Sequence, residues 1–322
     1  MRAIGIDLGG TSIKGALVHH AYGIVATAAL GTETDKGPDH VLGQIESVAR
    51  KLLRRTRNIV GLGIGAPGTI DPERARLIQP PNIPGWGDVD LKSILKSRLG
   101  QKLQVVVEND ANAAAMGSLR YGAGRPYDHF IMVTLGTGVG GAIIFNKKLF
   151  RGANGAAGEI GHMTVKYDGP KDKAGVHGAI EAYIGQRFLT AHARDQLSNF
   201  PDSLLHVAPG LQRLTPQLIA EAAIEGDAGA AHILQWAGHK LGCVLGSCVN
   251  LLDIRTIIVG GGISAAGDLI LEPARAAILS YIKPGMHEDV AVLREILGNE
   301  AGVLGAASLV FEEHYASSRG TG

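Results

Sequence analysis

A carboxylate between an apolar segment and an alanine-rich segment is the first residue whose position could serve chemistry. Residues 105–107 are all valine, Glu108 and Asn109 follow, and Asp110 precedes the alanines. This order predicts a strand that ends at Glu108 and a helix directly after it, where the helix dipole favours an ionised Asp110. Such a carboxylate can accept a hydroxyl proton during phosphoryl transfer. A helix cap formed by Asn109 or Asp110 explains the same residues, and this segment alone favours the cap slightly.

Two glycine-rich segments, each after an apolar run, could bind phosphate groups. Residues 7–14 read Asp-Leu-Gly-Gly-Thr-Ser-Ile-Lys, and residues 135–141 read Leu-Gly-Thr-Gly-Val-Gly-Gly. Glycine lets backbone N–H groups turn toward a phosphate, while Asp7 could hold a metal ion through water and Thr11 and Lys14 could donate hydrogen bonds. The P-loop spacing is absent, and a strand after the second segment excludes a dinucleotide fingerprint. A glycine turn with a structural aspartate is the alternative for the first segment.

A third polar group combines carboxylates with an imidazole. Glu159 and His162 lie on the glycine-rich segment Gly-Glu-Ile-Gly-His, and Glu181 follows within Ile-Glu-Ala-Tyr. These side chains suit the recognition of vicinal hydroxyls, each of which donates and accepts a hydrogen bond. Taken alone, this segment is better explained as a surface turn whose histidine packs.

The elements around these segments recur in the same order in both halves of the chain. Helical spacing of apolar residues predicts a helix over 39–55. The repeated order of strand, glycine turn and strand predicts a duplicated α/β architecture with a cleft between two lobes. We expect one lobe from residues 1–118 joined by a C-terminal helix at 305–322, and the other from 119–304. Strands are expected at 3–8, 15–19, 59–65, 104–108, 130–135, 141–145 and 256–259.

Length, charge and composition argue against a nucleic-acid-binding, membrane-spanning or secreted protein. A chain of 322 residues exceeds a typical single domain, and its net charge of +1 without a basic stripe argues against nucleic acid as a partner. The apolar run at 241–252 is too short to span a membrane, and nothing at the N-terminus resembles a signal peptide. Cys243 and Cys248 are poorly spaced for a disulfide on a predicted helix, so we expect inert buried thiols. A cytoplasmic enzyme or binding protein is expected.

Taken together, the motifs resemble those of the ROK family (repressors, open reading frames and kinases), especially its glucokinase-like sugar kinases. They occur in family order over nearly the whole chain, and no single one is specific. The segments are 7–14, Gly-Ala-Pro-Gly at 65–68, Pro-Asn-Ile-Pro-Gly-Trp at 81–86, Glu-Asn-Asp-Ala-Asn-Ala at 108–113, Gly-Thr-Gly at 136–138, Glu-Ile-Gly-His at 159–162 and Val-Gly-Gly-Gly-Ile-Ser at 259–264.

The resemblance implies the duplicated actin/hexokinase-like (ribonuclease H-like) α/β fold, with sugar and nucleotide in the interdomain cleft. Asp110 would be the general base on the sugar 6-hydroxyl. The implied cofactors are ATP and Mg²⁺, and a homodimer is expected because relatives are commonly dimers. The implied sugar-binding residues are Gly68, Asn82, Asn109, Asp110, Glu159, His162 and Glu181. The implied nucleotide-binding residues are Asp7, Gly9, Gly10, Thr11, Lys14, Thr137, Gly138, Gly261 and Gly262.

One departure from the family pattern concerns zinc. Kinases of this family usually carry a CxCGxxGC zinc loop before the Glu181 position, with the histidine at the His162 position as fourth ligand. The three cysteine positions hold Asp172, Ala174 and Ala179 here. Structural zinc needs about four ligands, usually thiolate or imidazole, so no structural zinc is expected. We expect a hydrogen bond from the protein, or tight packing of the loop, to orient His162 instead.

The expected activity is ATP-dependent phosphorylation of a hexose, with glucose favoured because residues 81–86 and 108–113 look glucokinase-like. Mannose or an N-acetylhexosamine is the alternative acceptor, and inorganic polyphosphate is the alternative donor. A sugar-responsive DNA-binding regulator is disfavoured, because such members carry a helix-turn-helix domain before the core and the phosphate motif here starts at Asp7. A non-catalytic sugar-binding protein is the remaining alternative.

Overall fold

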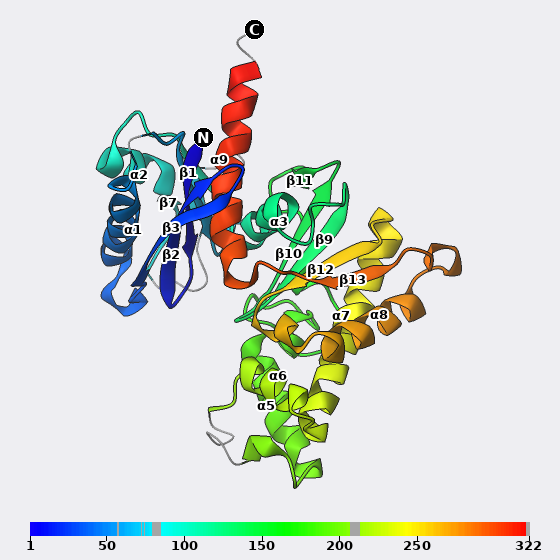
Figure 1. Cartoon of the computed structure of the whole chain (residues 1–322). Coiled ribbons are helices and arrows are strands. Elements are labelled where there is room, and N and C mark those ends of the chain that lie inside the picture. The colour runs from blue at the N-terminus through cyan, green and yellow to red at the C-terminus, as the bar shows by residue number, and fades with distance from the viewer. Residues whose placement is uncertain (57, 72, 74, 79–84, 207–212, 320–322) are drawn as a thin grey trace. The chain divides into compact units, whose positions relative to one another are not determined.

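The chain forms two compact units in the computed structural model, which describes residues 1–56, 58–71, 73, 75–78, 85–206 and 213–319 (Figure 1). Unit 1 consists of Met1–Pro126, Lys148–Ala157 and Asn299–Gly322, and unit 2 consists of Tyr127–Lys147 and Gly158–Gly298. Asn82, one of the expected pocket residues, lies outside the described residues.

The main sheet of unit 1 is mixed. The strands β3, β2 and β1 form an antiparallel meander, and β1, β4 and β8 run parallel to one another. Strand β1 is buried along most of its length, as expected for a central strand covered on both faces. The strands in spatial order are β3 (Gly23–Gly31), β2 (Ser12–His19), β1 (Arg2–Leu8), β4 (Leu62–Ala66) and β8 (Val105–Asn109).

Helices cover both faces of this sheet (Figure 1). Helix α1 begins with Pro38, which suits the first helical position, and it buries an apolar stripe that includes Val41, Ile45 and Val48 against the sheet. The helices of unit 1 are α1 (Pro38–Leu53), α2 (Leu91–Leu99), α3 (Asp110–Tyr121) and α9 (Ala301–Arg319). Its remaining strands, β5 (Thr69–Ile70), β6 (Arg76–Ile78) and β7 (Val89–Asp90), form a small separate sheet. Strand β11 (Lys148–Phe150) lies within the residues of unit 1 but is the edge strand of the sheet that contains β10 (Val139–Phe145).

Helix α9 packs directly against backbone. A Cβ added at Gly5 on β1 would overlap the Val303 carbonyl of α9, and one added at Gly305 on α9 would overlap the Ala113 carbonyl of α3. Side chains at these positions would hold the elements apart, because close-packed interiors leave no free volume of this size. Helix α9 therefore completes the core of unit 1 although it comes late in the chain.

Unit 2 repeats the strand order of unit 1. Strand β10 pairs antiparallel with β9, and β9, β12 and β13 run parallel, which matches the order β2, β1, β4 and β8. The predicted duplication of an α/β unit is thereby confirmed. The elements are β9 (Phe130–Leu135), β10 (Val139–Phe145), β12 (Thr256–Gly260), β13 (Ala291–Arg294), α4 (Glu181–Ile184), α5 (Gln186–Gln196), α6 (Pro216–Ile224), α7 (Ala228–Leu252) and α8 (Asp268–Tyr281).

The apolar run predicted at 241–252 belongs to helix α7, which packs along α8. No helix in the described ranges is both long and apolar enough to cross a bilayer. Cys243 and Cys248 lie on α7 as free thiols, and burial raises the pKa of the Cys248 thiol to about 11. A thiol with this pKa is unreactive near neutral pH.

Candidate active site

In unit 1, the parallel strands bring three of the expected residues to one edge of the sheet. Asp7 on β1 lies in register with Gly65 on β4, which lies in register with Glu108 on β8. Asn109 ends β8, and Asp110 opens α3. Because the carboxyl ends of parallel strands meet at one edge, the Asp7 and Asp110 carboxylates are electrostatic neighbours.

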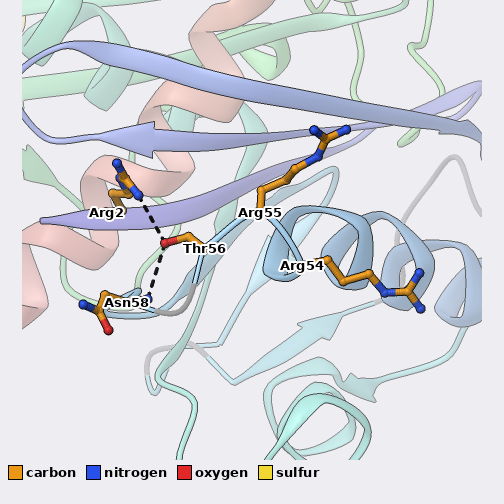
Figure 2. A pocket seen from close by; sticks show the side chains of 5 residues that line it. All are labelled: Arg2, Arg54, Arg55, Thr56 and Asn58. Atoms are coloured by element: carbon orange, nitrogen blue, oxygen red, sulfur yellow. Dashed lines mark hydrogen bonds between the residues drawn. The ribbon is translucent and has the colours of Figure 1, made fainter.

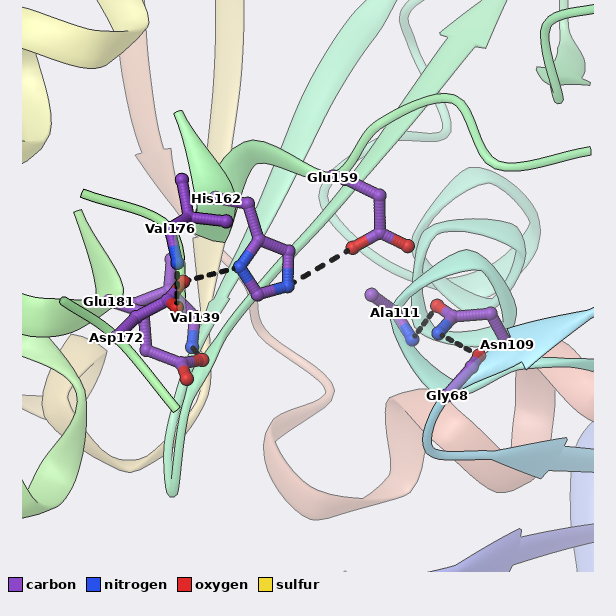
Figure 3. Close-up of polar contacts among 9 residues, drawn as sticks. All are labelled: Gly68, Asn109, Ala111, Val139, Glu159, His162, Asp172, Val176 and Glu181. Atoms are coloured by element: carbon purple, nitrogen blue, oxygen red, sulfur yellow. Dashed lines mark hydrogen bonds and ion pairs between the residues drawn. The ribbon is translucent and has the colours of Figure 1, made fainter. Parts of the chain in front are cut away.

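The helix cap and the candidate base are two different residues. Asn109 is the N-cap of α3, and its side-chain oxygen accepts hydrogen bonds from Ala111 N–H at 2.9 Å and Asn112 N–H at 3.1 Å. Its amide nitrogen donates to the Gly68 carbonyl at 3.1 Å (Figure 3). The Asp110 carboxylate accepts the Ala111 N–H at 2.8 Å and also interacts with its own backbone N–H, and the residue keeps an exposed surface. Asp110 is therefore not needed as the cap.

Both carboxyl groups hold their protons more tightly than usual. Burial, followed by the charge of Asp110, raises the pKa of Asp7 from 3.8 to about 6, although Lys14 opposes the shift. Lys14 faces Asp7 across the β1–β2 ladder. Desolvation by the surrounding protein atoms raises the pKa of Asp110 as well, although the residue keeps an exposed surface and the Ala111 N–H opposes the shift. The ionised form of Asp110 is thus less favoured than its place at a helix N-terminus predicts. Perturbed carboxyl groups of this kind are typical of functional sites, and a raised pKa makes a carboxylate a better proton acceptor.

The first glycine turn presents unused backbone donors. Gly9 N–H donates to the Ser12 carbonyl at 3.0 Å, and the buried Thr32 hydroxyl donates to the Gly9 carbonyl at 2.6 Å. These bonds hold the turn, while Gly10 and Thr11 are exposed. In the described part of the chain, nothing accepts a hydrogen bond from the backbone N–H of Gly10 or Thr11. Two open N–H groups beside a carboxylate fit a phosphate with its metal ion.

The second glycine turn, in unit 2, shows the same feature. Gly136 N–H closes the turn on the Gly138 carbonyl at 3.0 Å, and the backbone N–H groups of Thr137 and Gly138 have no acceptor among the residues described. At the end of β12, the Gly261 carbonyl accepts hydrogen bonds from the Ser264 N–H and hydroxyl, and Gly262 is exposed at the start of the following 3₁₀ turn. The predicted nucleotide-binding segments of unit 2 thus form open turns.

Glu181 lies against the second glycine turn. Its Oε2 accepts the Val139 N–H at 3.0 Å (Figure 3). A Cβ at Gly138 would overlap the same carboxylate oxygen, so this position admits only glycine without displacement. The resemblance assigns Glu181 to sugar recognition, and the contact that the structure provides is with the second glycine turn.

His162 is held by a residue that has no counterpart among the expected site residues. Its Nδ1 lies 2.6 Å from Oδ2 of Asp172, and its Nε2 lies 3.9 Å from Oε2 of Glu159 (Figure 3). One of the two expected means of holding His162, a hydrogen bond from the protein, is thus present. In the ranges that the structure describes, no group of three His, Cys, Asp or Glu is placed to hold a metal ion.

A partly buried ion pair beside the candidate base was not predicted from the sequence. Arg151 Nε and Nη2 each lie 2.9 Å from Oε2 of Glu108, whose side chain is 3% exposed. Oε1 of Glu108 accepts hydrogen bonds from Asn109 N–H and Asn112 Nδ2, both at 3.1 Å. The pair anchors the start of α3, and thereby Asp110, to the 148–157 segment of the same unit. The two residues are too far apart in sequence for any local pattern to pair them.

A separate pocket in unit 1, of about 430 Å³, contains none of the expected site residues. It is lined by Arg2, Arg54, Arg55, Thr56 and Asn58 (Figure 2). The Thr56 hydroxyl accepts hydrogen bonds from Arg2 Nη1 at 3.3 Å and Asn58 N–H at 3.4 Å. The Arg54 and Arg55 side chains point away from each other, so the arginines do not converge on one anion (Figure 2).

Comparisons with known proteins agree with the motifs. The ROK family profile matches residues 3–313. The chain is 36% identical over 314 residues to a glucokinase of Streptomyces coelicolor, covering 96% of this chain and 97% of that protein. It is 32% identical over 315 residues to a glucokinase of Thermotoga maritima, covering 97% of this chain and 98% of that protein.

A solved structure shares the architecture. The ROK family glucokinase from Streptomyces griseus, in complex with glucose and AMPPNP, superposes with a TM-score of 0.86 at 35% identity, covering 97% of this chain and 100% of that chain. The expected actin/hexokinase-like class of α/β fold is confirmed by this likeness together with the duplicated sheets. The protein described here belongs to the ROK family.

Proposed function

We propose that this protein is a sugar kinase that transfers the γ-phosphoryl group of ATP to a hexose hydroxyl, with glucose as the expected acceptor. Glucokinases are 32% and 36% identical to it over nearly its whole length. The observation that carries the proposal is the accessible Asp110 carboxylate, which has a raised pKa, is free of the capping role and neighbours Asp7.

In the proposed reaction, Asp110 accepts the proton of the sugar hydroxyl while the oxygen of that hydroxyl bonds to the γ-phosphorus. The bond from that phosphorus to the bridging oxygen breaks, and ADP leaves. The raised pKa of Asp110 favours this proton transfer. Arg151 fixes the start of α3 through Glu108, so the carboxylate is positioned before the substrate binds.

The nucleotide would be held by the open N–H groups of the turns at 9–11 and 136–138, with Gly261 and Gly262 near the adenosine. Asp7 fits a hydrated Mg²⁺ ion, because it is a carboxylate at the end of β1, next in sequence to the open N–H groups of the first glycine turn. Mg²⁺ bound with ATP would neutralise the charge that develops on the phosphates.

The sugar hydroxyls would be recognised by Asn109, Glu159 and His162, with Gly68 beside Asn109. Carboxylates, an amide and an imidazole offer both acceptors and donors, which is what vicinal hydroxyls require. In this proposal Glu181 supports the phosphate turn through Val139 and can share its second oxygen with the sugar.

A coupled assay with purified protein, run over glucose, mannose and N-acetylhexosamines with ATP or polyphosphate as donor, tests the activity and its specificity. Turnover of glucose with ATP is the expected result, and absence of turnover with every pair would refute a kinase.

Asp110→Asn distinguishes a role of Asp110 as the general base from a purely structural role at the start of α3. We expect a loss of at least about 100-fold in kcat, with the fold and calorimetric sugar binding retained. Asp90→Asn is the matched control, since Asp90 caps α2 by accepting Ser93 N–H at 2.9 Å, and asparagine caps equally well. A D110N protein with wild-type kcat would exclude Asp110 as the base.

A further inference from the structure

Asp172 is buried within a segment whose other residues face solvent. Its side chain is 0% exposed, whereas Lys171 and residues 173–177 are exposed. The segment is closed on itself by a bridge between Lys171 and His177 and by the hydrogen bond from Asp172 N–H to the Val176 carbonyl at 3.1 Å. Carboxylates are almost never fully buried unless they are paired, so a buried aspartate in an exposed turn needs a partner.

The Asp172 carboxylate has two such partners. Oδ1 accepts the Val176 N–H at 2.9 Å, and Oδ2 lies 2.6 Å from Nδ1 of His162 (Figure 3). Burial alone would raise the pKa of Asp172, but the hydrogen bonds from His162 and Val176 outweigh it and hold the pKa below its usual value. The carboxylate is therefore ionised at neutral pH, and an ionised carboxylate only accepts hydrogen bonds.

It follows that Nδ1 of His162 carries the proton that bonds to Asp172. In the neutral ring, the other nitrogen is then an acceptor. The ring is 37% exposed, and its Nε2 side faces the half-exposed Glu159, with 3.9 Å between Nε2 and Oε2. Nε2 of His162 and the Glu159 carboxylate thus present two acceptors side by side, spaced for two neighbouring hydroxyl groups.

We propose that Asp172 is a positioning residue: its buried carboxylate fixes the orientation and tautomer of His162, so that Nε2 accepts a hydrogen bond from a substrate hydroxyl. This role rests on the proposed sugar kinase function and extends it to a residue that touches no substrate. In catalytic and metal sites of other proteins, a carboxylate likewise orients an imidazole by accepting the hydrogen bond of one ring N–H.

Asp172→Asn is the discriminating substitution. Asparagine keeps the size of the side chain, and its oxygen can still accept the Val176 N–H. Its amide then donates to Nδ1, which moves the ring proton to Nε2. The protonated Nε2 then faces the Glu159 carboxylate, whose Oε2 is 3.9 Å away, and a hydrogen bond between them withdraws both groups from the sugar. We expect the KM for the hexose to rise about 10- to 100-fold, with kcat changed much less.

Asp168→Asn is the matched control on the same segment. Asp168 is 51% exposed and pairs only with Lys166 among the described residues, at 3.2 Å, so its loss of charge should leave KM and kcat at wild-type values. A purely structural role for Asp172 would instead lower thermal stability without a selective change in the hexose KM.

Nitrogen-15 NMR of the histidine rings reads the tautomer without any need for turnover. The chain has 12 histidines, and the His162 signals are assigned by their loss in His162→Gln. We expect an unprotonated Nε2 in the wild-type protein and a protonated Nε2 in D172N. A protonated Nε2 in the neutral wild-type ring, an unchanged ring in D172N, an unchanged KM, or stoichiometric zinc in the purified protein would each overturn the proposal.

The proposed kinase function and the positioning role of Asp172 can be refuted independently. A wild-type protein inactive on every hexose would refute the proposed function, and the ring spectrum would still decide whether Asp172 sets the tautomer of His162. An active wild-type protein with a D172N variant that keeps both its KM and its ring tautomer would refute only the positioning role.

Discussion

Replacing Asp7 by asparagine should stabilise the protein while removing its activity. Burial and the neighbouring Asp110 raise the pKa of Asp7 from 3.8 to about 6. A carboxyl with these values in the unfolded and folded states destabilises the folded state by about 3 kcal/mol above pH 6. Asp7 is only half-buried, so solvent screening brings the expected gain in D7N to about 1–2 kcal/mol.

The gain should depend on pH with a definite sign. Below pH 3.8 the carboxyl is protonated in both states and the penalty is absent. As the pH rises toward about 6, the unfolded chain ionises while the folded protein keeps its proton, so stability falls, and above pH 6 the penalty is constant. At pH 5 roughly half of the gain should remain.

Chemical denaturation at pH 8 and pH 5 measures this difference, and the coupled assay measures the loss of turnover. Asp35→Asn removes the same charge from an exposed site in unit 1 and should change stability by less than about 0.5 kcal/mol. Equal stability of D7N and the wild type at pH 8, or a gain of the same size at both pH values, would refute the reasoning.

Three further substitutions or treatments test the described contacts. Gly138→Ala should push the Glu181 carboxylate off the second glycine turn, so that the charge-assisted hydrogen bond from Val139 N–H is lost. We expect the KM for ATP to rise about tenfold in steady-state assays. An unchanged KM would argue against this turn as a phosphate site. Arg151→Met should destabilise the protein by about 3 kcal/mol in urea, because the buried Glu108 carboxylate loses its cation; a change below about 0.5 kcal/mol would contradict the pairing. Cys248, with its thiol pKa near 11, should resist iodoacetamide at pH 8 until the protein is unfolded, as read by peptide mass spectrometry.

The sequence predicted strands and helices best where an apolar pattern is followed by turn-forming residues such as glycine. Strands β1 and β9 precede glycine turns and are almost wholly apolar, and both were expected within a residue of their observed bounds. Strand β3 (Gly23–Gly31) was not expected, because it is an edge strand in which every residue is either partly buried or exposed, so no clear apolar run marks it. Strand β13 (Ala291–Arg294) was also missed, being too short to show a period.

The site was predictable in its residue types and less so in its contacts. Asn109 and Asp110 are equally good caps by type, and only the observed hydrogen bonds assign the cap to Asn109. The burial of Asp172 depends on the path of a loop that returns to His162, which composition does not encode. Arg151 meets Glu108 through the tertiary fold. Contacts of this range are set by packing rather than by local propensity.

The packing of α9 fixes the order in which the molecule can be completed during synthesis. Unit 2 occupies residues between the early strands of unit 1 and the helix that covers them. Gly5 is translated near the start, yet the helix that packs on it follows the whole of unit 2. Because domains generally fold as units while the chain emerges, unit 2 can reach its native state first. The part of the protein that carries Asp7 and Asp110 is made first and finished last, so an incompletely translated chain lacks the helix that completes the core beneath these two residues.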